Sequence, residues 1–74
     1  MTLEMMWLRR LVIASGNDYD VVGDILGVTS RTVQRYLSVG HINPTVVRTL
    51  ELIYLGGTEE LEEWLVNRAR GDVY

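Results

Sequence analysis

Cysteine and lysine are both absent from this chain of 74 residues, and histidine and proline each occur once. The lack of cysteine excludes disulfides and thiolate metal sites, so a secreted disulfide scaffold is not expected. His41 alone cannot build a histidine-rich metal site, and we expect no metal and no cofactor. No apolar run exceeds four residues, as at 11–14, whereas a membrane-spanning helix needs about 20. Because no secretory signal pattern occurs either, we expect a cytoplasmic protein without membrane contact.

The net charge of −3 is unevenly distributed along the chain. Residues 1–57 carry five arginines and five acidic residues, whereas residues 58–74 carry two arginines and five acidic residues. The whole acidic excess therefore lies in the last part of the chain, and the rest remains compatible with a nucleic-acid partner. Since every basic side chain is an arginine, anion contacts would use the planar guanidinium group, which suits phosphates and guanine edges.

Apolar side chains repeat with helical spacing, and no alternating strand pattern of useful length occurs. Asp18, Thr29, Asn43 and Thr58 each precede a helical stretch as candidate N-caps, and a proline follows Asn43 at the first helical position. A chain of this length forms one small core. We therefore predict a single compact all-α domain over residues 1–74. Its five helices are predicted at about 3–15, 19–26, 30–39, 44–55 and 59–70.

Residues 19–38 carry the pattern of two short helices packed at a steep angle. Gly23 is the small residue that their crossing point needs, and Gly27, four positions later, suits a turn with positive φ. Arg31 and Arg35 lie on the polar outer face of the second helix. The inward positions are apolar, at Val22, Leu26, Val28, Val33, Tyr36 and Leu37. These features together are typical of a helix-turn-helix.

The next segment, GHINPTVVRTL at residues 40–50, adds to this pattern. A glycine turns the chain after the second helix, and Asn43 with Pro44 opens the following one. From about residue 8 to residue 55 the chain resembles the Cro/lambda-repressor-like DNA-binding domain family. Its size and layout look especially like small phage-type regulators, including the anti-CRISPR-associated repressors. The resemblance implies a five-helix fold in which the helix at 30–39 enters the major groove.

The resemblance also assigns contacts by position. Residues at the start of the recognition helix read base edges, where an arginine can bind guanine and a glutamine can bind adenine through two hydrogen bonds. Tyr19 stands where the family more often has a phosphate-binding glutamine, and His41 stands near a position that is often basic. The implied base contacts are Ser30, Arg31, Gln34 and Arg35. The implied phosphate contacts are Tyr19, Thr29, Thr32, His41 and Asn43. Outside such a motif, the same side chains would be ordinary solvated residues.

The last predicted helix carries an apolar stripe around Trp64. This stripe either closes the core of the monomer or forms a two-fold interface, and recognition of paired half-sites by dimers favours the interface. We therefore predict a homodimer with a dimerisation helix at 58–71, whose acidic surface faces away from DNA. The residues predicted at this interface are Leu61, Trp64 and Leu65, with Ile53, Tyr54 and Val73 as further members.

No enzyme is expected, because no serine or threonine has a histidine base in its vicinity and no phosphate-binding glycine loop occurs. The acidic residues at 59–63 have the pattern of a solvated helix face, and we expect no small-molecule substrate. We predict a sequence-specific transcriptional regulator, a phage-type repressor that binds an inverted-repeat operator in double-stranded DNA as a homodimer. Two alternatives stay open. One is a protein-binding helix-turn-helix module, antitoxin- or inhibitor-like, and the other is a small DNA-packaging or partition adaptor.

Overall fold

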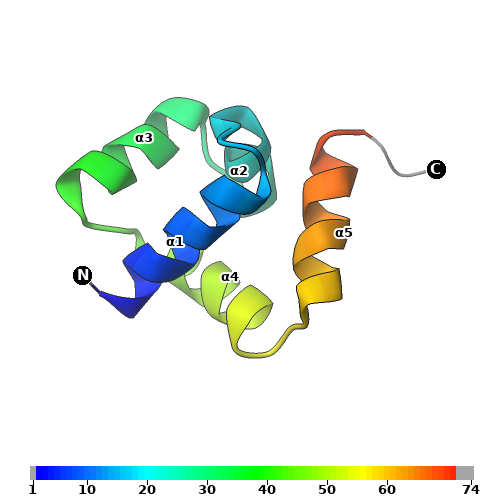
Figure 1. Cartoon of the computed structure of the whole chain (residues 1–74). Coiled ribbons are helices and arrows are strands. Elements are labelled where there is room, and N and C mark those ends of the chain that lie inside the picture. Colours follow the sequence, from blue (N-terminus) through cyan, green and yellow to red (C-terminus); the bar gives the residue numbers. More distant parts are fainter. Residues whose placement is uncertain (1, 72–74) are drawn as a thin grey trace.

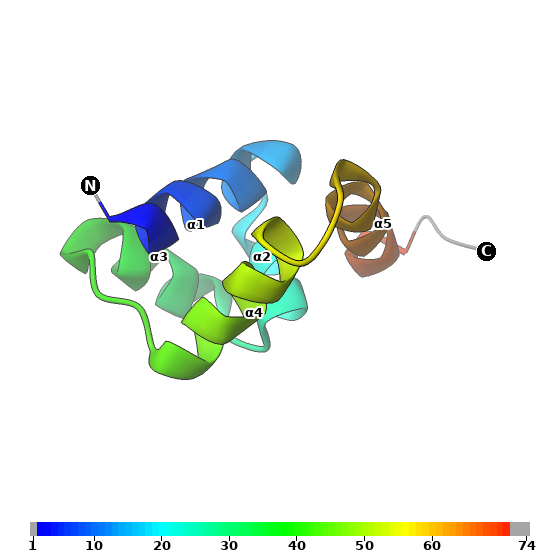
Figure 2. The ribbon, with the colours of Figure 1, turned by 90° about the horizontal axis from the view of Figure 1, so that it is seen from below.

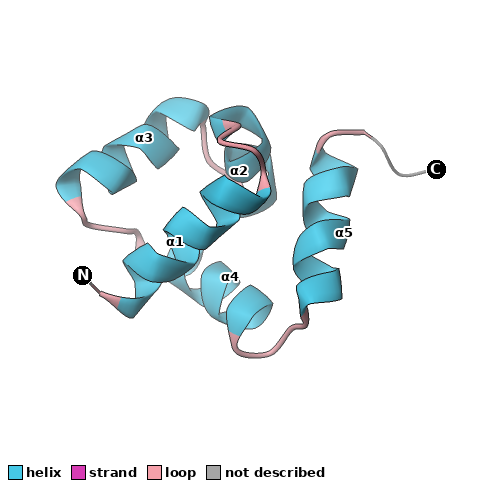
Figure 3. Cartoon of the chain, in the orientation of Figure 1, coloured by secondary structure: helices cyan, strands magenta, loops and turns pink. Residues whose placement is uncertain are grey.

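A computed structural model describes residues 2–71, in which five α-helices and no strand occur (Figures 1 and 3). The all-α prediction is confirmed for this part of the chain. The predicted helix ends at 15, 55 and 70 are each one residue too long, because these residues are C-caps. The helices are α1 (Leu3–Ala14), α2 (Tyr19–Leu26), α3 (Ser30–Val39), α4 (Pro44–Tyr54) and α5 (Glu59–Ala69).

Local capping explains where the helices begin and end. The four predicted N-caps all accept hydrogen bonds from the first turn of their helices, at Asp18, Thr29, Asn43 and Thr58. At the other ends of α2 and α3, Gly27 and Gly40 adopt φ values of 75° and 80°. Glycine takes this left-handed conformation without the steric cost that a Cβ atom brings. Short-range signals therefore fix the boundaries of the helix pair α2–α3.

One cluster of buried side chains draws on all five helices. Each fully buried aliphatic side chain contributes about 1.5–3 kcal/mol relative to an exposed one. The central members, from α1 to α5 in order, are Leu8, Leu11, Val22, Val33, Leu50 and Val66. Among residues 2–71, no helix combines the length and the hydropathy that crossing a membrane requires.

α5 packs against α1 and α2, and it lies across the molecule from α3 (Figures 1 and 2). Arg10 on α1 pairs with Glu62, with 3.1 Å between Nε and Oε2. The hydroxyl of Tyr54, at the end of α4, donates to the same carboxylate oxygen at 2.5 Å. The guanidinium group of Arg70 donates to the backbone carbonyl at the end of α1. These polar contacts fix α5 to both α1 and α4.

Because of the contact between Tyr54 and Glu62, the free energy of unfolding is expected to fall at alkaline pH. Burial, and then the hydrogen bond to the Glu62 carboxylate, raise the pKa of Tyr54 well above its ordinary value of 10.0. As the pH rises, the unfolded chain therefore loses this proton first. The contribution of Tyr54 to stability is fully present below about pH 10 and is lost progressively above it.

Tyr54→Phe is therefore expected to lower the free energy of unfolding at pH 7 by about 1 kcal/mol, since it removes the hydrogen bond to Glu62. The same change should also weaken the fall in stability between roughly pH 9 and pH 11. Urea denaturation followed by circular dichroism, at pH 7 and across the range from about pH 9 to pH 11, measures the two effects. An alkaline loss of stability as large in the variant as in the parent chain would contradict this role of Tyr54.

Candidate nucleic-acid interface

Gly23 on α2 is buried and packs closely against the turn that leads into α3. A Cβ atom at Gly23 would overlap the carbonyl oxygen of Val28 and would lie 3.2 Å from the carbonyl carbon of Thr29. The backbone N–H of Val28 donates to the carbonyl of Gly23 at 2.8 Å. Gly27 differs, because a Cβ atom there would meet nothing within 4 Å, whereas its φ of 75° is left-handed. One glycine thus provides space, and the other provides backbone conformation.

α3 presents its apolar side to the core and its polar side to solvent. Val33 and Tyr36 are buried, whereas Arg31, Gln34 and Arg35 are exposed. Within residues 2–71, neither arginine of α3 takes part in an ion pair with an acidic side chain. Both guanidinium groups are therefore available for an anionic ligand.

Several other arginines already have partners inside the chain. Arg10 pairs with Glu62, and Arg70 binds the carbonyl at the end of α1. Arg68 stacks on the ring of Trp64, with 5.2 Å between the guanidinium carbon and the ring centroid. The arginines of α3 thus differ from these in having no intramolecular partner among the described residues. Arg9 and Arg48 are likewise exposed and form no ion pair within residues 2–71, so the candidate binding surface is the outer face of α3 because it carries two such arginines together.

Three of the predicted contact residues meet at the C-terminal end of α3. Arg35, His41 and Asn43 are all exposed and line one hollow of the surface. The Asn43 side chain accepts a hydrogen bond from the Thr45 N–H at 2.8 Å through Oδ1, so its NH₂ group remains available as a donor. A guanidinium, an imidazole and an amide NH₂ group in one hollow are the kinds of donor that bind a phosphate.

The other end of α3 is acidic. Ser30 and Gln34 line a second hollow together with Tyr19, as the family resemblance implies, but Asp18 and Asp20 line it too. Two carboxylates at this position disfavour a phosphate. Asp18 was predicted as an N-cap, whereas no role was predicted for Asp20. The sequence does contain a sign of this acidic end, because Asp18 and Asp20 flank Tyr19, which was itself predicted to contact a phosphate.

Thr29 and Thr32 interact with each other at the start of α3. The Thr29 hydroxyl oxygen accepts a hydrogen bond from the Thr32 N–H at 3.2 Å, and the two hydroxyl oxygens lie 2.9 Å apart. One of the two hydroxyl protons is used in that contact, which leaves one O–H group for an external acceptor. The pair therefore offers a single hydroxyl donor to a phosphate, and Thr29 and Thr32 both stay predicted phosphate contacts.

No protein-family model, curated protein or solved structure matches this chain. The family suggested by the sequence therefore stays a prediction, and the side chains around α3 are the basis for assigning a function.

Two members of the predicted dimer interface lie at the end of α4, and burial argues against one of them. Ile53 is only 4% exposed, because the atoms of its own chain cover it. Tyr54 is half-buried, its hydroxyl is bound to Glu62, and its ring lies 5.4 Å from the guanidinium carbon of Arg10. Ile53 therefore offers almost no surface to a second chain, whereas Tyr54 keeps an exposed part and the end of α4 also carries Leu52 and Leu55, which are 66% and 69% exposed.

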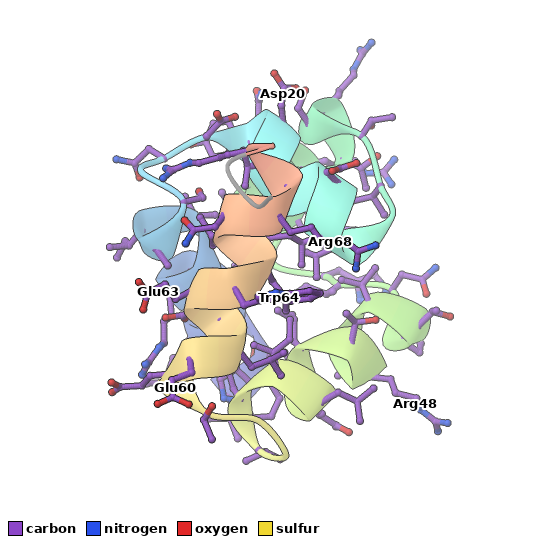
Figure 4. The ribbon with its side chains drawn as sticks, turned by 90° about the vertical axis from the view of Figure 1, so that its right-hand side faces the viewer. Asp20, Arg48, Glu60, Glu63, Trp64 and Arg68 are labelled. Carbon is purple, nitrogen blue, oxygen red and sulfur yellow. The ribbon has the colours of Figure 1, made fainter. Side chains whose placement is uncertain are left out.

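The remaining predicted interface residues are on α5. Leu61 and Leu65 are half-buried, whereas Trp64 is 46% exposed. Figure 4 shows Trp64 and Arg68 side by side on one flank of α5, with Glu63 on the other flank. Val73 lies outside the described residues. The exposed part of the predicted interface is therefore centred on Trp64.

Proposed function

We propose that this chain is a sequence-specific DNA-binding transcriptional regulator that places α3 in the major groove. The observation that carries this proposal is the outer face of α3. Arg31, Gln34 and Arg35 are exposed there, and the arginines have no acidic partner within the described residues. Gly23 allows α2 to support this helix at close range. α3 is thereby held as a fixed platform for its polar side chains.

The side chains on this face match the chemistry of base edges. An arginine forms two hydrogen bonds with O6 and N7 of guanine, and a glutamine forms two with N6 and N7 of adenine. Each such pair discriminates against a wrong base by about 1–3 kcal/mol. The proposed base contacts are therefore Arg31, Gln34 and Arg35. Ser30 beside them is partly buried and has a shorter side chain, so it would contact only a base that comes close to the helix.

The phosphate contacts follow from the two hollows. We expect the DNA backbone to run past Arg35, His41 and Asn43, where donors gather. The carboxylates of Asp18 and Asp20 disfavour the DNA backbone at the start of α2. The acidic helix α5 lies across the molecule from α3, so its carboxylates add little repulsion (Figures 1 and 2). In this arrangement the net negative charge of the chain does not prevent DNA binding.

A homodimer bound to an inverted repeat would act as a phage-type repressor by covering a promoter. The test is a gel shift with the DNA upstream of its own gene at 50–200 mM salt. The logarithm of the affinity should fall linearly with the logarithm of the salt concentration, by about 0.9 per phosphate neutralised. No shift at the lowest salt concentration would refute the proposal.

Removal of the carboxylate of Asp20 is expected to strengthen DNA binding. Asp20 is exposed and lines the same hollow as Ser30 and Gln34, so its charge repels the approaching backbone. Asp20→Asn should raise the affinity about 2- to 5-fold at low salt. Glu63→Gln, which makes the same change in charge on α5, should leave the affinity unchanged. Fluorescence anisotropy with a labelled duplex measures both, and equal effects of the two variants would show that only the net charge matters.

A protein-binding module is the second candidate function. It is favoured by the carboxylates beside α3 and by exposed apolar side chains on α1, of which Leu3, Met6 and Ile13 are at least half exposed. Apolar side chains at a surface are typical of protein contacts rather than of phosphate contacts. Failure to shift DNA at low salt would favour this candidate. A mass well above that of a dimer would instead favour a DNA-packaging or partition adaptor.

A further inference from the structure

We propose that the groove between α1 and α3 docks an amphipathic helix of another protein, which supplies a carboxylate to Arg9. None of the proposed base contacts lines this groove, so the inference goes beyond DNA binding. Docking here can also be measured without DNA.

The groove is a surface hollow of about 260 Å³ between two helices. α1 and α3 lie side by side and run in largely opposite directions (Figures 1 and 2). The residues that line the hollow are Arg9, Val12, Ile13, Asn17, Tyr19 and Leu37. Half of these side chains are aliphatic, and they come from both helices. A ridge of apolar side chains on a third helix can pack into a groove of this kind.

The exposed face of α1 extends the groove. Ile13 is 73% exposed and Met6 is 54% exposed, and the two lie seven residues apart, which is about two helical turns. They therefore share one face of α1, and Leu37 on α3 is half-buried beside it. Apolar side chains that gather on one exposed face are typical of protein contacts. A docked helix would remove these side chains from water.

The charge at the groove indicates what the partner must carry. Arg9 lies between Met6 and Ile13 in the sequence, on the same face of α1, and it is exposed. It forms no ion pair within residues 2–71, whereas Arg10 beside it pairs with Glu62. Arg9 is also the one charged residue among the described residues that line the hollow. A carboxylate beside the apolar stripe of the partner therefore complements this surface.

Other occupants fit the groove less well. The neighbouring hollow shares Tyr19 with it and is lined by Asp18 and Asp20, whose carboxylates repel a polyanion such as DNA or an anionic membrane. A second copy that used the same groove about a two-fold axis would bring Arg9 close to Arg9. An apolar helix with a local acidic group avoids both kinds of repulsion.

The test is a selection of helical peptides against the full chain in the absence of DNA. The library holds peptides of about 16 residues, with apolar residues fixed at positions i, i+3, i+4 and i+7 and all other positions random. The recovered peptides should carry an aspartate or glutamate beside the apolar stripe. In fluorescence anisotropy, Ile13→Glu should weaken their binding about 10-fold or more, because its carboxylate would lie against apolar side chains. Arg9→Glu should weaken it about 5-fold, because an attraction becomes a repulsion.

Reversal of the charge on the peptide tests the contact with Arg9 directly. A peptide with lysine in place of its acidic residue should bind Arg9→Glu more tightly than it binds the parent chain. The matched controls on α4 are Leu52→Glu, at a side chain that is 66% exposed, and Arg48→Glu, at an exposed arginine. Both controls should keep the affinity of the parent chain within about 2-fold. Circular dichroism should show unchanged helix content in every variant compared.

Four results would each overturn the proposal. They are a selection that returns no binder, peptides that bind Ile13→Glu as tightly as the parent chain, a lysine peptide that does not prefer Arg9→Glu, and controls as weak as Ile13→Glu. Because no DNA is present, these results do not depend on whether α3 binds DNA. Failure of the gel shift would refute only the proposed function.

Discussion

Gly23→Ala is expected to lower the free energy of unfolding by about 3 kcal/mol, at the upper end of the cost of an added methyl group in a packed site. The methyl group would overlap the carbonyl oxygen of Val28, which belongs to the backbone and cannot rotate away as a side chain can. A domain of this size has a total stability of only about 4–11 kcal/mol. The substitution should therefore shift thermal unfolding, followed by circular dichroism, to a clearly lower temperature.

Gly27→Ala is the matched control for this substitution. It adds the same methyl group four residues later, where nothing lies within 4 Å, but where φ is 75°. Its cost should be the conformational penalty alone, about 1–2 kcal/mol. If the two variants lost equal stability, the close approach of α2 to the turn before α3 would not be the reason for a glycine at position 23.

Loss of both arginines from the outer face of α3 is expected to have the largest effect on DNA binding. Each bidentate contact to guanine is worth about 1–3 kcal/mol, so Arg31→Ala/Arg35→Ala should weaken binding to the preferred site by about 2–6 kcal/mol. Because both side chains are exposed, helix content and thermal stability should stay close to those of the parent chain. Fluorescence anisotropy with a duplex selected from a random pool measures the loss.

Arg48→Ala separates a specific contact from a general effect of charge. Arg48 is an exposed arginine on α4, and in Figure 4 it lies at the opposite end of the view from Asp20 at the start of α2. Its removal should change affinity for the selected duplex by less than about 0.5 kcal/mol. Single variants of Arg31 and Arg35 then distinguish their roles. Loss of a base contact relaxes the sequence preference at one position, whereas loss of a phosphate contact weakens binding to all sequences alike.

The helices could be predicted closely from the sequence because their boundaries depend on neighbouring residues. Asp18 and Thr29 accept hydrogen bonds from amides two or three residues ahead, and Gly27 and Gly40 end α2 and α3 through their own φ angles. Each of these signals involves only residues that lie a few positions apart in the sequence. The sequence pattern also distinguished Gly23, which packs closely against the segment leading into α3, from Gly27, which has a left-handed φ.

The surroundings of the candidate site could not be predicted in the same way. The hollow that Asp20 shares with Gln34 forms only when α2 and α3 pack together, and the sequence gives no sign of that distance. Arg10 is exposed and pairs with Glu62, which lies 52 residues later in the sequence, and no local pattern predicts such a pair. Trp64 was expected within an apolar stripe facing a partner or the core, and its exposure follows from how α5 is rotated about its axis. The contacts of Arg10 with Glu62 and of Arg70 with α1 help to set that rotation.

Titration of the ¹⁵N-labelled chain with duplex DNA, followed by NMR, tests the central claim most directly. If the outer face of α3 binds DNA, the amide signals of residues 29–35 and 41–43 should shift progressively and revert when salt is added. Signals from the Glu63 flank of α5 should stay in place. Shifts concentrated on α5, or a spectrum unchanged by excess DNA at low salt, would contradict the account.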